Sequence, residues 1–361
     1  MDYRLLGRSG LRVSKLGLGT MTFGTDWGWG ADEATCREIY DAYRGAGGNM
    51  IDTANMYTNG SSERITGDLI ASDRDDMVLA TKFTDVMGHG DTGPGITGVA
   101  PNGAGNGRKN MVQSVEGSLK RMRTDRIDLL WVHSWDFATP MEELMRGLDD
   151  LVASGKVLYV GLSDAPAWAG AACNVMADLR GWTRFIGLQI EYSLIERTPE
   201  RELVPMADAM GMGVVAWSPL ASGVLTGKYN QGDGSGRLGG AEIERWKFDV
   251  AQAAIDVAER HGASPAQVAL AWLVAKGAVP LVAGTKVAQV EDNLRAADLT
   301  LSADDIEALD GAQDVSLGFP HDFLEATREI TWGNAFARTE KAGVTGLLPR
   351  HLKGGGGKAP L

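Results

Sequence analysis

The alternation of short apolar runs with helical patterns constrains the fold of this chain more than any other feature. A hairpin is predicted first, in which Leu5–Leu6 and Arg12–Ser14 flank a turn at Ser9–Gly10. Eight β-rich runs follow, at Leu16–Leu18, Met50–Asp52, Val78–Thr81, Ile127–Trp131, Val157–Leu162, Ile186–Ile190, Gly213–Ala216 and Val279–Ala283. Most of these runs lack the polar alternation of a sheet with one wet face, so they predict strands buried on both faces. Eight such strands, separated by helices, favour a closed (β/α)8 barrel.

Helical periodicity fills the gaps between the runs. Two apolar stripes have the spacing of one helix face, Cys36, Ile39, Tyr40 and Tyr43 in one segment and Met141, Leu144, Met145 and Leu148 in another. Such stripes indicate helices that pack on a sheet. Pro140, Pro166 and Pro265 stand where the first turns of helices are predicted, because a missing N–H costs nothing there.

Composition is that of a globular protein. Of the 361 residues, 44% are hydrophobic and 23% are charged, which excludes fibrous and disordered classes. One barrel domain is expected over residues 1–313, because α/β barrels often exceed ~250 residues. An extension is expected over 314–361, where a Gly354–Gly357 run predicts a flexible tail.

Charge and cysteine content narrow the possible partners. The formal net charge of -12 disfavours binding to nucleic acid or to anionic membranes. Without a long apolar run or a signal peptide at the N-terminus, a cytoplasmic protein is expected. Cys36 and Cys173 lie far apart without a CxxC pattern, so both are interpreted as core residues and no metal site is expected.

Two segments depart from the regular pattern. Met87–Gly107 is rich in Gly, Pro, Asn and Asp and is too long for a plain connection, so it predicts either a lid or a disordered insertion. Past Asp314, the chain carries aromatic residues that could cover the mouth of the barrel, namely Phe319, Phe323, Trp332 and Phe336. The predicted architecture is thus a barrel with an N-terminal hairpin and long loops at its C-terminal face.

Candidate catalytic residues stand where strands end. In an α/β barrel, functional groups lie at the carboxyl ends of the strands, and three successive runs end at Asp52, Lys82 and His133. Tyr57 follows Asp52 by five residues, so the two side chains can converge only across a strand-to-loop corner. Each residue alone is also compatible with capping, packing or a solvated surface. Together, they favour a catalytic site.

Several ordered motifs resemble the aldo-keto reductase family. They are RLLGRSGLRVS from Arg4, GLGTM from Gly17, DTANMY from Asp52, ATKF from Ala80, WVHSWD from Trp131, GKVLYVGLSD from Gly155, WSPLASGVLTGKY from Trp217 and QVEDNL from Gln289. The resemblance spans roughly Tyr3 to Gln313. It implies an NAD(P)H-dependent oxidoreductase that interconverts aldehydes or ketones and alcohols on a TIM barrel, with small carbonyl or alcohol compounds as substrates.

The four candidate residues fit that chemistry. Hydride addition to a carbonyl leaves an alkoxide that needs a proton, and Tyr57 is the predicted general acid. Lys82 is expected to stabilise the phenolate and to lower the pKa of Tyr57, and Asp52 is expected to hold Lys82 in place. His133 is expected to polarise the carbonyl. No side chain supplies a hydride, so a nicotinamide cofactor is predicted.

The resemblance also places the cofactor along the chain. Gly19, Thr20, Met21 and Asp52 belong to the predicted cofactor site, Ser163, Asp164 and Gln189 face the nicotinamide carboxamide, and Trp217 stacks on the nicotinamide ring. The family usually has Asn where this chain has Asp164, and an ionised Asp cannot donate a hydrogen bond to the carboxamide oxygen. The remaining predicted contacts are Ser218, Pro219, Leu220, Ser222, Gly223, Leu225 and Lys228 for the pyrophosphate and Gly284, Thr285, Lys286, Gln289, Asp292 and Asn293 for the adenosine.

Cofactor preference and substrate depend on fewer signals. Lys286 could meet the 2′-phosphate of NADPH, although the family's usual Arg aligns nearer Thr285, so Lys286 is also compatible with a solvated surface lysine. NADPH is favoured over NADH. The predicted walls of an apolar substrate pocket are Trp27, Trp29, Trp135 and Trp332.

Two other functions are compatible with parts of the pattern. A non-catalytic nucleotide sensor would resemble the potassium-channel β-subunits, which share much of the cofactor site. A phosphate-binding barrel isomerase would use two acid/base residues and no nicotinamide. The four catalytic candidates favour the enzyme.

Overall fold

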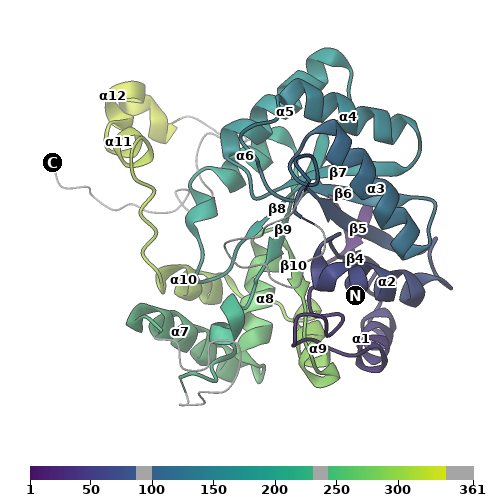
Figure 1. Ribbon diagram of the computed structural model, residues 1–361. Coiled ribbons are helices and arrows are strands. Elements are labelled where there is room, and N and C mark those ends of the chain that lie inside the picture. The colour runs from purple at the N-terminus through teal and green to yellow at the C-terminus, as the bar shows by residue number, and fades with distance from the viewer. Residues whose placement is uncertain (87–99, 231–242, 339–361) are drawn as a thin grey trace.

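Eight parallel strands form a closed barrel in the computed structural model, which describes residues 1–86, 100–230 and 243–338 (Figure 1). The strands follow one another around the barrel in chain order, and β10 closes it against β3. Their bounds are β3 Gly17–Gly19, β4 Met50–Asp52, β5 Val78–Phe83, β6 Ile127–Val132, β7 Val157–Ser163, β8 Phe185–Glu191, β9 Gly213–Trp217 and β10 Val279–Val282. The predicted barrel is confirmed, and each predicted run overlaps one strand.

Helices cover the outside of this barrel (Figure 1). The α-helices are α1 Glu33–Gly45, α2 Ser61–Ile70, α3 Arg108–Met122, α4 Met141–Ala153, α5 Ala167–Arg180, α6 Leu203–Met210, α7 Arg245–His261, α8 Pro265–Ala275, α9 Val287–Leu294, α10 Ala303–Gly311, α11 His321–Ala326 and α12 Arg328–Trp332. Short 3-10 turns are η1 Tyr57–Gly60, η2 Thr198–Glu200, η3 Ala221–Thr226, η4 Arg295–Ala297 and η5 Gly333–Arg338. Pro140 and Pro166 directly precede α4 and α5, and Pro265 begins α8.

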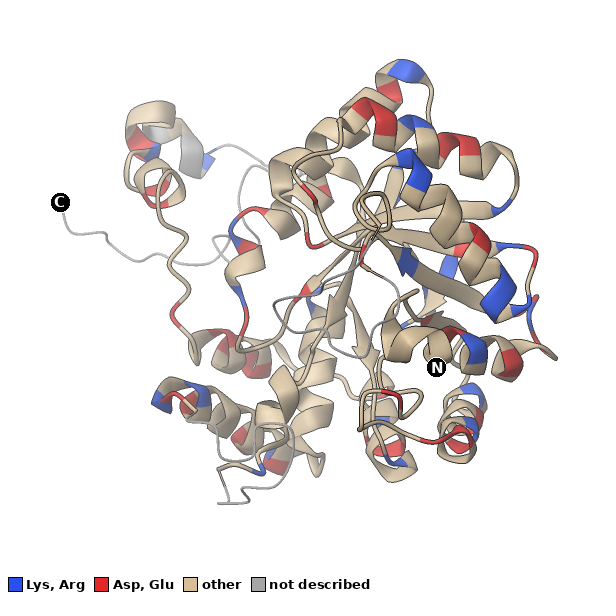
Figure 2. Ribbon diagram, viewed as in Figure 1, with Lys and Arg blue, Asp and Glu red and all other residues tan. Residues whose placement is uncertain are grey.

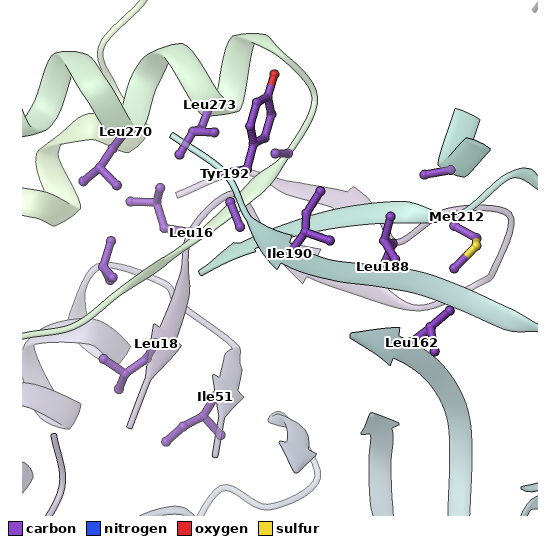
Figure 3. Packing of buried hydrophobic residues seen from close by; sticks show 14 of the residues in the cluster. Leu16, Leu18, Ile51, Leu162, Leu188, Ile190, Tyr192, Met212, Leu270 and Leu273 are labelled. Atoms are coloured by element: carbon purple, nitrogen blue, oxygen red, sulfur yellow. The ribbon is translucent and has the colours of Figure 1, made fainter. Parts of the chain in front are cut away.

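The core has an outer and an inner layer. The outer layer lies between strands and helices and includes Leu18, Ile51 and Leu188 (Figure 3). The four predicted apolar residues of α1 are all buried there, and both cysteines are buried and free. The inner layer fills the barrel with buried side chains from the strands and from the hairpin, namely Leu6, Val13, Met50, Val78, Ala80, Leu129, Trp131, Val215, Val279 and Leu281.

The predicted N-terminal hairpin is present and lies at the bottom of the barrel. Strands β1 Tyr3–Leu5 and β2 Arg12–Ser14 pair antiparallel. Leu6 follows β1, is 1% exposed and enters the inner layer. A Cβ on Gly213, the first residue of β9, would lie 2.6 Å from Leu6. The hairpin therefore closes the end of the barrel opposite to the carboxyl ends of the strands.

Charged residues are concentrated on the outer helices and loops (Figure 2). Among the described residues, no helix is long and apolar enough to cross a membrane. The first part of the predicted lid, residues 87–99, lies outside the described residues, as does the Gly354–Gly357 run. The final part of that loop is anchored, because the Asn106 N–H donates to Asp136 at 2.8 Å. A lid at this loop stays a prediction.

As far as Arg338, where the described residues end, the C-terminal extension does not cover the mouth of the barrel as the aromatic residues had led us to expect. Arg201 donates to the Ser316 carbonyl at 2.9 Å, and His321 lies 2.8 Å from Glu202 at the start of α6. These contacts direct α11 and α12 along the side of the molecule, where they stand off the barrel (Figure 1). Phe319 is 85% exposed. The side chain of Phe336 lies outside the described residues.

Candidate active site

The four catalytic candidates converge at the carboxyl ends of neighbouring strands. Asp52 is the last residue of β4, Lys82 is the last but one of β5, and His133 directly follows β6. Tyr57 begins η1, five residues beyond Asp52, at the corner that the sequence predicted. Strands β4, β5 and β6 pair in parallel, which brings the three strand ends together.

Lys82 links the acidic and the phenolic member of this group. Its ammonium forms an ion pair with Asp52 Oδ1, and it donates to the Thr53 carbonyl at 2.9 Å and to the Tyr57 hydroxyl at 3.2 Å. Asp52 and Lys82 are each 1% exposed. A buried charge pair is stable only when its remaining lone pairs and protons have partners, and here the contacts orient the ammonium towards Tyr57.

The pKa values of Lys82 and Tyr57 are shifted in ways that the sequence did not reveal. Burial would lower the pKa of Lys82, but Asp52 and Tyr57 outweigh it and raise that pKa, so the ammonium stays charged. Burial raises the pKa of the Tyr57 phenol. Lys82 acts in the expected direction and lowers it, yet burial, together with Asp52, has the larger effect. The expectation of a depressed phenol pKa is therefore wrong, and Tyr57 keeps its proton at neutral pH.

His133 lies beside Tyr57 and has an acidic neighbour that the sequence analysis missed. The two rings meet edge to face, with centroids 6.0 Å apart. His133 Nδ1 is 3.0 Å from Asp85 Oδ2. Burial opposes ionisation of Asp85, but His133 outweighs it and holds the pKa of Asp85 below its usual value. Asp85 follows Lys82 by three residues, so the rule that placed the other candidates at strand ends could have found it.

Two further donors bind the second oxygen of Asp52. Trp131 Nε1 and Gln189 Nε2 each donate to Asp52 Oδ2 at 2.9 Å. Gln189, predicted as a carboxamide contact, therefore uses one of its two amide N–H groups on Asp52 and retains its second N–H and its carbonyl oxygen for another group. Trp131 was not singled out from the sequence, although it has the same strand parity as Leu129 and His133.

The other predicted carboxamide residues gather at the ends of β7 and β9. Trp217 Nε1 donates to Asp164 Oδ1 at 3.0 Å, and the Ser163 hydroxyl lies 3.2 Å from Asp164 Oδ2. Burial raises the pKa of the Asp164 carboxyl, although Trp217 and His133 oppose this shift. Directly after β3, the Thr20 hydroxyl donates to the Asp52 carbonyl at 3.0 Å, and the half-buried Met21 follows it.

The predicted pyrophosphate segment has an unusual backbone. Ser218, Ala221, Ser222 and Gly223 all have positive φ angles, between 47° and 92°, and turns of this kind expose backbone N–H groups to an anion. Lys228 brings a cation to this turn, since a Cβ on Gly223 would lie 3.6 Å from its Nζ. Pro219 and Leu220 complete the turn, and the Leu225 side chain is fully buried. Hydroxyls, backbone and ammonium fit a diphosphate.

The predicted adenosine segment runs from β10 into α9. Thr285, Lys286 and Gln289 are exposed, and Gln289 Oε1 accepts from the Thr285 N–H at 3.1 Å. Gly284 is tied to the first loop, because its carbonyl accepts from Thr22 at 2.9 Å. The described contacts give a structural role to two other predicted residues. Asp292 accepts from Ser264 and Gln267 at the start of α8, and Asn293 is 5% exposed.

Of the four predicted pocket tryptophans, the structure brings two towards Tyr57. Trp27 meets the Tyr57 ring edge to face at 6.4 Å, and Trp29 lies 5.7 Å from Trp27. Trp135 is instead 9% exposed and packs its ring on Trp168 of α5 at 6.2 Å. Trp332 lies in α12, away from the barrel, because the extension is held at the start of α6 (Figure 1).

Comparison with known proteins places the chain in a family. The model of the aldo/keto reductase family matches residues 15–314. The chain belongs to the aldo-keto reductase family. It is 38% identical over 333 residues to a norsolorinic acid reductase of Aspergillus flavus, covering 90% of this chain and 84% of that protein. It is 39% identical to an aldo-keto reductase of Emericella nidulans (89% and 83% covered) and 35% identical to a putative aryl-alcohol dehydrogenase of Saccharomyces cerevisiae (91% of each).

This aldo-keto reductase is therefore an oxidoreductase, as the motifs predicted. Aldo-keto reductases in general use nicotinamide nucleotides, and the reductase relatives imply small carbonyl or alcohol compounds as substrates. The match to residues 15–314 ends close to the predicted end of the barrel domain and leaves the C-terminal extension outside.

Proposed function

We propose that this enzyme reduces aldehydes or ketones to alcohols, or catalyses the reverse reaction, with Tyr57 as the general acid. The contact that carries the proposal is the buried Lys82 ammonium, which lies between the Asp52 carboxylate and the Tyr57 hydroxyl, 3.2 Å from the latter. An acid beside a buried cation suits proton delivery to a developing alkoxide, because the cation stabilises the phenolate that remains. This geometry favours an enzyme over a nucleotide sensor.

The protein residues account for the movement of the proton. A bound nicotinamide supplies the hydride that adds to the carbonyl carbon. The Tyr57 hydroxyl donates its proton to the carbonyl oxygen, and Lys82 stabilises the phenolate. His133 donates a hydrogen bond to the same oxygen and so polarises the carbonyl, and Asp85, 3.0 Å from its Nδ1, orients the ring. In the oxidation direction, the phenolate takes the proton back from the alcohol.

The cofactor is proposed to lie across the C-terminal face from β7 to α9. Ser163, Gln189 and Asp164 would hold the carboxamide, Trp217 would stack on the ring, and the turn from Ser218 to Lys228 would hold the pyrophosphate. The support for the last of these is the run of positive φ angles beside the Lys228 ammonium. NADPH is proposed over NADH, because Lys286 is an exposed cation at the start of α9.

An aromatic carbonyl compound is the proposed substrate class. Trp27 and Trp29 form an aromatic surface that extends from the Tyr57 ring, and such a surface favours flat, apolar ligands. One relative is named as a putative aryl-alcohol dehydrogenase. Trp135 and Trp332 are not part of this surface, since their rings lie elsewhere.

Replacement of the proposed acid tests the function. Tyr57→Phe keeps the ring but removes the proton donor, so reduction of benzaldehyde is expected to fall by roughly a thousandfold or more. Cofactor dissociation constants, measured by fluorescence titration, should change little. Tyr159→Phe, a half-buried tyrosine at the middle of β7, is the matched control and should retain activity. Near-normal turnover by Tyr57→Phe would contradict the assignment.

The preference for NADPH rests on one lysine and is tested separately. NADPH differs from NADH by a 2′-phosphate of about two negative charges, which a nearby cation would bind. Lys286→Ala should raise the Michaelis constant for NADPH severalfold and leave that for NADH almost unchanged. Lys276→Ala, which removes a lysine paired with Asp310 on α10, is the control. A wild-type enzyme that prefers NADH would rule out this role for Lys286.

A further inference from the structure

Trp131 is a fully buried side chain whose only polar atom contacts the proposed catalytic group. It is 0% exposed and lies in the inner layer of the barrel. Its Nε1 donates to Asp52 Oδ2 at 2.9 Å. Trp131 precedes His133 by two residues in β6 and pairs with Lys82 of β5. The indole therefore approaches the site from below, inside the barrel, whereas cofactor and substrate would enter from the mouth.

The contacts of Asp52 show what this bond does. Oδ1 faces the Lys82 ammonium, and Oδ2 accepts from Trp131 and Gln189. A carboxylate with partners on both oxygens cannot rotate without breaking bonds, and charge-assisted bonds of this kind are about twice as strong as neutral ones. Gln189 also stands among the proposed carboxamide contacts, so its amide has two tasks. The Trp131 N–H has only one.

Two glycines of the barrel wall make room for the Trp131 indole. A Cβ on Gly161 of β7 would lie 2.3 Å from Trp131 Cε3, and one on Gly187 of β8 would lie 2.9 Å from Cη2. Real Cβ atoms do not approach this closely, so only glycine fits at either position. The ring thus packs closely against the backbones at Gly161 and Gly187, which leaves it little freedom to turn away from Asp52.

We propose that Trp131 is a positioning residue that holds the Asp52 carboxylate in the orientation that faces Lys82, and thereby keeps the ammonium beside Tyr57. This inference rests on the proposed function, in which Tyr57 donates the proton. Trp131 does not contact the reacting atoms. Its loss should therefore slow proton transfer without weakening the binding of cofactor or substrate.

A matched pair of variants tests the proposal by kinetics. Trp272 of α8 is also 0% exposed and donates to a carboxylate, Asp310 Oδ1, at 2.9 Å, but it lies outside the barrel. Trp131→Phe is expected to lower kcat for benzaldehyde by roughly tenfold, with KM and the cofactor dissociation constant unchanged within about twofold. Trp272→Phe should leave kcat unchanged. Equal kcat values for the two variants would overturn the proposal.

A second variant separates the hydrogen bond from packing. Benzothienylalanine at position 131 has the shape of tryptophan with sulfur in place of the N–H, so it preserves the fit against Gly161 and Gly187. It should reproduce the loss of kcat even if Trp131→Phe fails to fold. Full activity of the benzothienyl enzyme would show that Trp131 acts by filling space and would overturn the proposal.

The apoprotein gives a readout that needs no turnover. Each of the ten tryptophans contributes one indole N–H resonance to a nitrogen–proton correlation spectrum, and the benzothienyl and Trp272→Phe proteins assign the two of interest. Asp52→Asn should shift the Trp131 resonance and leave that of Trp272 in place. An unmoved Trp131 resonance would overturn the proposal. A wild-type chain without carbonyl reduction would contradict the proposed function alone, since the resonance still reports the Trp131–Asp52 bond.

Discussion

At the scale of single residues, the chemistry was easier to predict than the contacts that support it. Asp52, Lys82 and His133 could be found because each marks the end of a strand, where a barrel places its functional groups. Trp131 could not, because its role depends on Asp52, 79 residues away, through a bond that only the closed barrel creates. The pKa of Tyr57 was mispredicted for a related reason, since burial cannot be read from neighbours in sequence.

Asp164 leads to a pH-dependent prediction. When ionised, Asp164 can only accept hydrogen bonds, whereas Asn can also donate to the carboxamide oxygen. Asp164→Asn should therefore bind NADPH several times more tightly at neutral pH. Burial raises the pKa of Asp164. As the pH falls towards that pKa, the wild-type carboxyl gains a proton and can donate a hydrogen bond to the carboxamide oxygen. The advantage of the variant should therefore shrink.

Fluorescence titrations over a pH series measure this difference. Asp85→Asn is the control, because it removes a negative charge from the same face without touching the proposed carboxamide site. If both variants tighten binding equally at every pH, the gain is general electrostatic attraction of the anionic cofactor, and the specific role of Asp164 is wrong.

At the scale of elements, buried strands were predicted well and the peripheral helices were not. The apolar runs coincide with strands within about two residues at each end, which is the usual uncertainty of an element boundary. Helices α11 and α12 have no buried residues, so no apolar stripe marks them in the sequence. Capping gives a clearer local signal, as Ser302 shows at the start of α10, where it accepts from the Asp305 N–H at 3.1 Å.

Loss of this cap should destabilise α10. Ser302→Ala removes the acceptor for the Asp305 N–H and should lower the free energy of unfolding by about 1 kcal/mol, whereas Ser302→Thr should preserve it.

Arg260, Ser302 and His261 hold the pKa of Asp305 below its unfolded value. Asp305 therefore contributes stability above its unfolded pKa and loses it as the pH falls through the folded one. Urea denaturation at neutral and acidic pH measures both effects. Equal stability of the Ala and Thr variants would contradict the role of the cap, and equal stability of the wild type at both pH values would contradict the role of Asp305.

At the scale of the whole molecule, the two ends of the barrel have separate tasks. The carboxyl ends of the strands carry the proposed catalytic residues and the loops of the proposed cofactor site. The opposite end is closed by the N-terminal hairpin, whose Leu6 side chain lies in the inner layer. The sequence predicted both the hairpin and the barrel. It did not predict that the hairpin would fill the barrel from below, because the length of an apolar run does not reveal which end of a barrel it covers.

This division predicts that a substitution in the hairpin lowers the free energy of unfolding and leaves kcat unchanged. Leu6 is 1% exposed and contacts the barrel strands, whereas its neighbour Leu5 is 55% exposed. Leu6→Ala leaves a cavity in the inner layer and should lower the free energy of unfolding by about 2–5 kcal/mol, measured by chemical denaturation. Leu5→Ala is the matched control, and it should change that free energy by less than about 0.5 kcal/mol.

At a temperature where both variants are folded, kcat per folded molecule should match the wild type, because the proposed catalytic residues lie at the other end of the strands. A Leu6→Ala enzyme with normal stability would show that the hairpin does not support the barrel, and a reduced kcat per folded molecule would show that the two ends are coupled.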